Sequence, residues 1–256
     1  MFTIFKPVFE SVWKRKETKI YLSFAIIFPL VFLASTFLPE GSNFMVPTVE
    51  GDYRFTFLNM FMIILMAALD LTLPVLALFY LTYTVFRGEV DSHTLFLYKD
   101  IKRRDVFWAK LASLLLITII FFGLFFLVML GVYYGRVGYM PYASLTFWDK
   151  IPEDGLHNLY AFITYIFDGL VSILLATCLS LYAGLGKTMT AAFTYEIGTA
   201  LLSIFGLGIL VPNGLSNNIF EGMPFVTALG LSSLITLIYS SILIFLSLKF
   251  FKKIEF

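Results

Sequence analysis

The sequence predicts an all-α integral membrane protein. Its expected architecture is six transmembrane helices with an amino-terminal amphipathic interfacial helix and a short cytosolic helix, and with both chain ends in the cytosol (N-in/C-in). Three observations predict this architecture. Of the 256 residues, 59% are hydrophobic and only 14% are charged, whereas soluble domains carry about 25% charged residues. The apolar residues form long runs, and nearly all lysines and arginines fall between alternate runs. We therefore expect a single membrane-embedded domain.

Residues 1–19 predict a helix that lies on the cytosolic membrane surface. Phe5, Phe9, Val12 and Trp13 recur at helical spacing, with charged residues between them. This pattern is typical of an amphipathic interfacial helix, and tryptophan and lysine both suit the headgroup region. The alternative is an ordinary basic segment that flanks the first transmembrane helix.

Six apolar runs are long enough to cross a bilayer. About 20 residues of helix span roughly 30 Å of hydrocarbon, and a helix satisfies its own backbone hydrogen bonds in lipid. The second run extends over about 30 residues, or some 45 Å of helix, so it must tilt, kink near Pro74 or extend into the cytosol. The first run lacks a small-residue cleavage motif and is read as a retained span. The predicted spans are 20–38, 57–86, 106–133, 159–183, 189–211 and 225–248.

The distribution of positive charge predicts the orientation. With the amino terminus in the cytosol, only Arg54, Arg136 and Lys150 of the 18 lysines and arginines lie outside. Cytosolic loops are enriched in these residues, whereas acidic residues contribute little to orientation. Six spans also return the basic carboxyl-terminal segment to the cytosol, so the number of spans and the charge distribution agree.

Several classes of function are disfavoured by the sequence. The net charge of +1 argues against a nucleic-acid partner, which normally requires a basic surface. The histidines, His93 and His157, fall in loops, and Cys178 is the single cysteine, so we expect no catalytic residue and no metal site. Residues 184–188 resemble part of a phosphate-binding loop, but Leu181 stands where that loop needs glycine.

Three acidic residues fall within the predicted spans: Asp70, Asp168 and Glu196. A carboxylate in lipid is costly, so these side chains should face the bundle interior or a wet cavity, where they line a translocation path or bind protons. The alternative is a structural role, with hydrogen bonds to neighbours such as Tyr165 or Ser172. Glu196 lies nearer the cytosolic edge, where a structural or snorkelling role is expected.

The segment 87–105 joins the second and third spans. Asp91 or Ser92 is suited to cap a short helix, and Leu95, Phe96 and Tyr98 give that helix apolar contacts among charged residues. An exposed apolar face on a cytosolic helix indicates a docking element. From the residues alone, a solvated basic loop is an equally good interpretation.

The same segment resembles the permease subunits of ABC-2 type transporters. In that family an acidic pair precedes Thr-Leu, an apolar patch and a Pro-Ile-Ser-Arg stretch follow, and a lysine opens the third span. His93, Asp100 and Lys102 replace the usual Gly, Pro and Ser of that pattern. The residues at matching spacing are Glu89, Asp91, Thr94, Leu95, Leu97, Ile101, Arg103, Asp105 and Lys110.

The resemblance implies one ABC-2 type transmembrane domain over residues 1–256, with a coupling helix in 87–105 that also includes Arg104. That helix would seat in a separate ABC ATPase subunit, which binds ATP and Mg²⁺, so this chain needs no cofactor and is not an enzyme. The chain would be the permease subunit of an exporter in a bacterial plasma membrane, paired with a second copy or a related permease. The expected cargo is a small amphipathic peptide or a hydrophobic compound. The alternatives are an ion-coupled secondary transporter that uses the embedded carboxylates, and a membrane scaffold.

Overall fold

The computed structural model describes residues 2–39, 45, 53–91 and 101–253. It is all-helical, with 82% of residues in helices and no strand within those ranges. The α-helices are α1 (Phe2–Trp13), α2 (Lys16–Ser35), α3 (Phe57–Asp70), α4 (Leu73–Tyr83), α5 (Glu89–Asp91), α6 (Arg103–Gly135), α7 (Pro152–Tyr182), α8 (Leu185–Ile204), α9 (Ser216–Phe220) and α10 (Phe225–Lys253). Shorter turns are the π-helix η1 (Thr84–Gly88) and the 3-10 helices η3 (Val137–Tyr139) and η4 (Gly208–Leu210).

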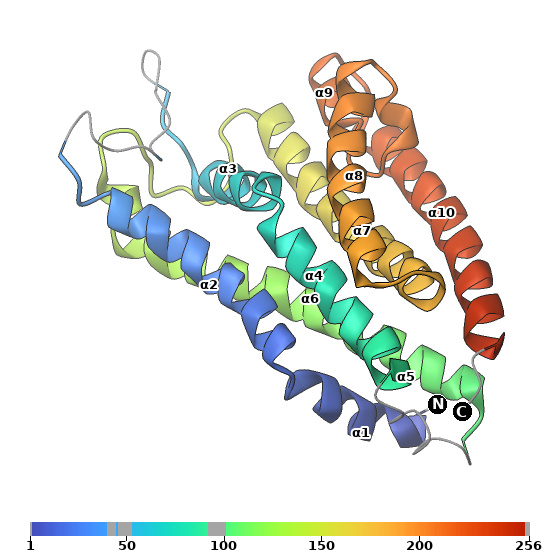
Figure 1. The fold of residues 1–256 in the computed structure, drawn as a ribbon. Helices are drawn as coiled ribbons and strands as arrows, with labels where there is room; N and C mark the ends of the chain where they lie inside the picture. The colour runs from blue at the N-terminus through green and yellow to red at the C-terminus, as the bar shows by residue number, and fades with distance from the viewer. Residues whose placement is uncertain (1, 40–44, 46–52, 92–100, 254–256) are drawn as a thin grey trace.

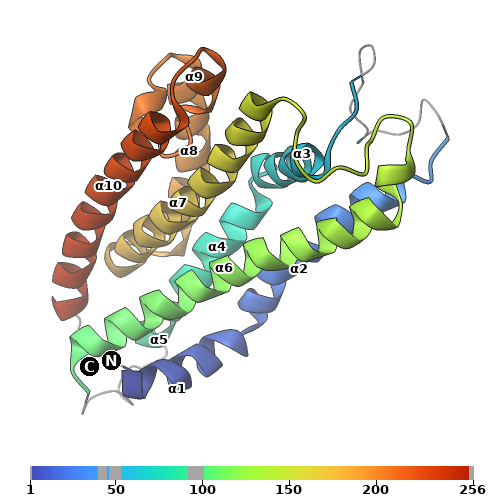
Figure 2. The ribbon, with the colours of Figure 1, turned by 180° about the vertical axis from the view of Figure 1, so that it is seen from behind.

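The long helices form two groups that meet at α4. Helix α2 runs alongside α6, and α7 packs along α10 and contacts α8. Helix α4 contacts α2 on one side and α7 and α8 on the other, so it joins the groups (Figures 1 and 2). The bundle therefore has its central contacts along α4 and α7.

Four helices among the described residues are long and apolar enough to cross a membrane: α2, α6, α7 and α10. The pair formed by α3 and the stretch Leu73–Asp91 is a fifth candidate, although it bends by 60° at the break. Helix α8, with 20 residues, is long enough but less apolar, since Lys187, Glu196 and several threonines lie in it. The membrane-embedded character is thus supported, and the sixth span stays a prediction.

The break in the long second run lies between α3 and α4. Thr72 adopts the left-handed conformation, with φ 58°, and Pro74 occupies the first turn of α4. Proline cannot donate to the carbonyl four residues earlier and its ring collides with that carbonyl, which here belongs to Asp70. Of the three expectations for this run, the structure therefore has the kink near Pro74.

Thr72 offers a direct test of this break. A β-branched residue in the left-handed region is strained by roughly 1–2 kcal/mol, whereas glycine is not. We expect Thr72→Gly to raise the free energy of unfolding in mixed micelles by about 1 kcal/mol. Thr190→Gly is the matched control, because Thr190 lies within helix α8 and should lose stability instead. Equal losses in the two variants would contradict a strained Thr72.

Aromatic side chains dominate the core between α3 and α6. Phe57 and Phe61 on α3 and Phe125 and Tyr133 on α6 are fully buried. The rings of Phe61 and Phe125 lie 5.9 Å apart in an edge-to-face arrangement, and those of Phe57 and Tyr133 lie 5.5 Å apart. Such pairs contribute about 0.5–1.5 kcal/mol beyond the area they bury. They attach α3 firmly to α6 beside the break.

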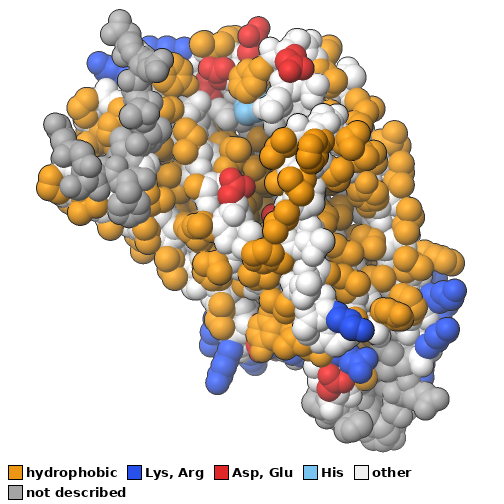
Figure 3. All heavy atoms as spheres, turned by 45° about the horizontal axis from the view of Figure 1, so that its top comes forward, with side chains coloured by type: hydrophobic (Ala, Val, Ile, Leu, Met, Phe, Trp, Pro, Cys, Tyr) orange, Lys and Arg blue, Asp and Glu red, His pale blue; other side chains and the backbone are white. Residues whose placement is uncertain are grey.

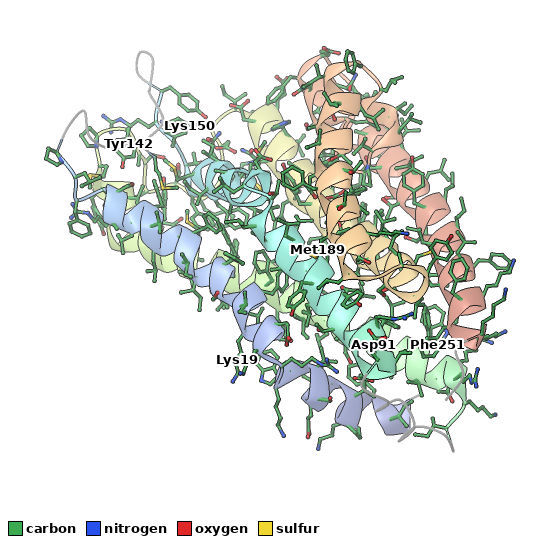
Figure 4. All side chains as sticks on the ribbon, viewed as in Figure 1. Lys19, Asp91, Tyr142, Lys150, Met189 and Phe251 are labelled. Carbon is green, nitrogen blue, oxygen red and sulfur yellow. The ribbon has the colours of Figure 1, made fainter. Side chains whose placement is uncertain are left out.

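The ends of the bundle differ in charge. Helix α1, helix α5 and the end of α10 lie together at one end, where the two chain ends meet (Figures 1 and 2). Figure 4 places Asp91 and Phe251 at this end and Tyr142 and Lys150 at the opposite one. In Figure 3, hydrophobic side chains cover the middle of the visible face, while lysines and arginines gather mainly below it. This distribution agrees with the predicted orientation, which itself stays a prediction.

An amino-terminal helix forms over Phe2–Trp13, which is shorter than the predicted 1–19 because residues 16–19 belong to α2; its place at the membrane surface stays a prediction. Val8 and Val12 are buried, and the helix packs mainly on α6. The rings of Phe5, Phe9 and Trp13 follow one another at 5.9 Å on a partly exposed face. The helix therefore has one apolar face against the protein and an aromatic stripe suited to the membrane interface.

Candidate functional site

The three acidic residues predicted within the spans line one cavity in the bundle, of about 130 Å³. Asp70 comes from the break between α3 and α4, Asp168 from α7 and Glu196 from α8. Helices α2 and α6 complete the wall with Tyr21 and Thr118. The cavity thus lies where the two groups of helices meet, and Glu196, expected nearer the cytosolic edge, shares it with the other acids.

Helical periodicity explains why α7 and α8 each present a polar face to the cavity. On α7, Tyr165, Asp168 and Ser172 are spaced i, i+3 and i+7, and all three line the cavity. On α8, Glu196, Thr199 and Ser203 have the same spacing and line the facing wall. Residues at this spacing share one face of a helix. The remaining faces of the two helices carry apolar residues such as Phe193 and Ile197, which are exposed.

Asp168 is anchored across the wall of the cavity. The Tyr195 hydroxyl on α8 donates a hydrogen bond of 2.5 Å to Asp168 Oδ1. The sequence offered Tyr165 and Ser172 as partners for the embedded acids, but neither forms a hydrogen bond with them in the described part of the chain, whereas Tyr195 was not considered. The bond links α7 to α8 beside the cavity that Asp168 lines.

Other polar atoms at the cavity lack partners among the described residues. Ser172 is 2% exposed, and its Oγ accepts and donates no hydrogen bond. Glu196 Oε1 is buried in the same way. Most buried polar groups in proteins are hydrogen-bonded, so each exception requires an explanation. Here the atoms belong to residues that line one cavity, which indicates that water or a ligand supplies their partners.

Among the residues that the structure describes, the cavity lining contains carboxylates but neither lysine, arginine nor histidine. Within the described part of the chain, no group of three His, Cys, Asp or Glu side chains is placed to hold a metal ion. The site is therefore acidic and roomy without the close ligand cluster that a metal needs. Its walls also contain the rings of Phe122 and Tyr165.

A second polar cluster lies at the basic end of the bundle. Glu89, on α5, forms ion pairs with Arg15, between α1 and α2, and with Lys110 on α6. Lys110 is fully buried, and its Nζ lies 2.6 Å from Glu89 Oε2. The cluster joins three segments that are distant in the sequence. We call Arg15, Glu89 and Lys110 the ion cluster.

The π-helix η1 supplies additional acceptors to this cluster. Lys110 Nζ donates to the Val85 carbonyl at 2.8 Å, and Arg15 donates to the Thr84 carbonyl at 3.0 Å. A π-helical turn displaces the regular hydrogen-bond pattern, so its carbonyl groups can accept from side chains. Lys110 also lies 5.5 Å from the centre of the Phe86 ring. These contacts fix η1, which follows α4, to the start of α2 and to α6.

The predicted coupling residues fall partly outside the described chain. Thr94, Leu95 and Leu97 lie in 92–100, outside the described residues. Asp91 forms an exposed pair of 2.9 Å with Arg87, and Ile101 packs on the core.

The remaining two coupling residues lie at the start of α6. Arg103 donates to the Lys252 carbonyl at 2.7 Å, which ties α6 to the end of α10, while Arg104 is exposed. The resemblance included Glu89 and Lys110 in one motif without predicting that they form an ion pair, and Arg15 was used only to predict membrane orientation.

Comparison with known proteins does not assign the chain to a family. No protein-family model matches the chain, and neither curated proteins nor solved structures give a match.

Proposed function

We propose that this chain is the membrane-spanning permease subunit of an ATP-driven exporter, energised by a separate ABC ATPase subunit that binds ATP and Mg²⁺. The proposal follows the ABC-2 resemblance of segment 87–105 and the apolar helices, four of which are suited to cross a membrane. A second copy or a related permease would complete the path, in a bacterial plasma membrane. The proposed cargo is a small amphipathic peptide or hydrophobic compound.

The ion cluster is the observation that carries this proposal. A partner that pushes on segment 87–105 must transmit the movement to the helices around the path. Glu89 lies near the start of that segment and is fixed to the start of α2 through Arg15 and to α6 through Lys110. Buried, hydrogen-bonded charges resist separation, so the three elements should move together.

The test is to express the chain with its genomic neighbours, purify it and ask whether an ATPase accompanies it. In proteoliposomes containing that complex, Arg104→Glu should abolish most cargo transport while ATP hydrolysis continues, because Arg104 is exposed on the proposed contact. The same uncoupling of ATP hydrolysis from transport is expected in a double variant with Arg103→Glu and Arg104→Glu. It is also expected in the single variant Leu95→Pro.

Lys187→Glu is the matched control, since it reverses an exposed charge in the first turn of α8, outside the segment 87–105. It should preserve coupling. Normal coupling in the Arg104→Glu and Leu95→Pro variants would contradict the proposed contact.

The cavity favours one alternative, an ion-coupled secondary transporter. Asp70, Asp168 and Glu196 line the same space and are suited to carry protons. In that case the purified chain alone would transport cargo in liposomes, a protonophore would stop transport, and vanadate would have no effect. Vanadate-sensitive transport that requires the ATPase would exclude this alternative.

A further inference from the structure

We infer that the acidic cavity binds the head group of an amphipathic organic cation. The inference deepens the proposed function by naming the chemistry of the cargo, and it rests on that proposal for the statement that the bound molecule is transported. The binding itself is a property of this chain. It follows from the charge, the unpartnered atoms, the rings and the size of the cavity.

The charge of the lining selects a cation. Asp70, Asp168 and Glu196 line the cavity, and the described part of the chain contributes no lysine, arginine or histidine to its walls. An ionised carboxylate without a countercharge in an apolar environment is strongly disfavoured, so it either takes up a proton or acquires a positive partner. An anionic ligand would add to the repulsion, and a neutral one would leave it uncompensated.

Unpartnered atoms point independently to a ligand that donates hydrogen bonds. Ser172 Oγ is almost completely buried and has no partner within the described chain, and Glu196 Oε1 shares this condition. A carboxylate oxygen can only accept, whereas a hydroxyl can accept and donate. An ammonium group has several N–H donors and can therefore satisfy Ser172 and Glu196 at once.

The rings and the size of the cavity select an organic cation. Tyr21, Phe122 and Tyr165 lie in the wall, and aromatic faces attract ammonium groups by about 2 kcal/mol when water is excluded. A cavity near 150 Å³ holds one benzene molecule, so the volume of about 130 Å³ suits a head group and not a complete peptide. Apolar residues beside the acids, among them Leu69 and Leu78, are suited to the alkyl part of the ligand.

Binding to the purified full-length chain in nanodiscs tests the inference. The probes share an octyl chain and differ in the head group: octylammonium, octyl sulfonate and octyl glucoside. We expect saturable binding of octylammonium by isothermal titration, and none of the other two. Asp168→Asn combined with Glu196→Gln should weaken it about tenfold or more, because two attractive charges are lost.

Two further variants separate binding from folding. Ala200→Phe keeps every acid and fills the cavity from an exposed position on α8, so it should also abolish binding in a folded protein. Glu221→Gln removes an exposed acid that does not line the cavity and should bind as the unsubstituted protein does.

The outcomes distinguish the two proposals. The cation site is overturned if all three probes bind equally. It is also overturned if octylammonium binds without change to the Asp168→Asn/Glu196→Gln variant and to the Ala200→Phe variant. Octylammonium binding that meets these expectations supports the site, and if in addition no ATPase accompanies the chain when it is expressed with its genomic neighbours, the exporter is contradicted while the site stands. ATP-dependent transport without saturable cation binding supports the exporter and overturns the site.

Discussion

Replacement of Lys110 by methionine is expected to lower the free energy of unfolding by about 3 to 5 kcal/mol. Lys110 is fully buried, and its Nζ contacts Glu89 and the Val85 carbonyl. Methionine has a similar length but cannot donate, so Glu89 would lose the Lys110 ammonium group as a partner in a buried position. The change should be measurable by SDS titration in mixed micelles.

Two variants show whether charge or packing causes this loss. Arg87→Met removes an exposed partner of Asp91 and should cost less than about 1 kcal/mol, as exposed pairs usually do. Glu89→Leu in the Lys110→Met background removes the uncompensated carboxylate and should recover part of the stability. If the double variant is as unstable as the sum of the single ones, the ion pair is not the source of the loss.

A second large effect is expected from Gly214→Ala. A Cβ atom at Gly214 would lie 2.2 Å from the backbone oxygen of Gly208, and a Cβ at Gly208 would lie equally close to the Gly214 oxygen. Backbone atoms cannot move aside as a flexible side chain can, so the turn between α8 and α9 must shift. Overpacking of this kind costs about 1–3 kcal/mol, and we expect the upper end of that range.

The same substitution should reach the cavity. Asn213 lines the cavity and precedes Gly214, so a shifted turn should weaken octylammonium binding as well as stability. Gly198→Ala is the matched control, because a Cβ there meets no atom within 4 Å and alanine favours the helix by about 1 kcal/mol. If the Gly214→Ala protein is as stable as the control, the backbones at Gly208 and Gly214 are not in close contact.

Much of the helical structure could be predicted because lipid permits few backbone arrangements. Each predicted span corresponds to a helix or helix pair, and the amino-terminal amphipathic pattern corresponds to α1. Pro74 indicated a kink in the second run, and the structure has a break there. Tilting and extension were equally compatible with the length of that run, since proline is also tolerated in transmembrane helices when neighbours satisfy the freed groups.

The acidic residues of the candidate site could be predicted from the sequence, but the way in which the helices bring them together could not. Asp70, Asp168 and Glu196 stood out because acids are rare in apolar runs. The spacing of Tyr165, Asp168 and Ser172 on one helix, and of Glu196, Thr199 and Ser203 on another, was a signal that could have extended the set. Tyr195 gave no such signal, because its role depends on the rotation of α8 against α7.

The sequence by itself determined that the chain is helical and membrane-embedded, since hydropathy and backbone hydrogen bonding act along the chain and need no partner segment. Only the tertiary structure decided that three acids from different helices share one cavity, and that Arg15 and Lys110 enclose Glu89. These arrangements depend on how helices rotate and cross when side chains interlock, and sequence spacing within one helix carries no information on that packing.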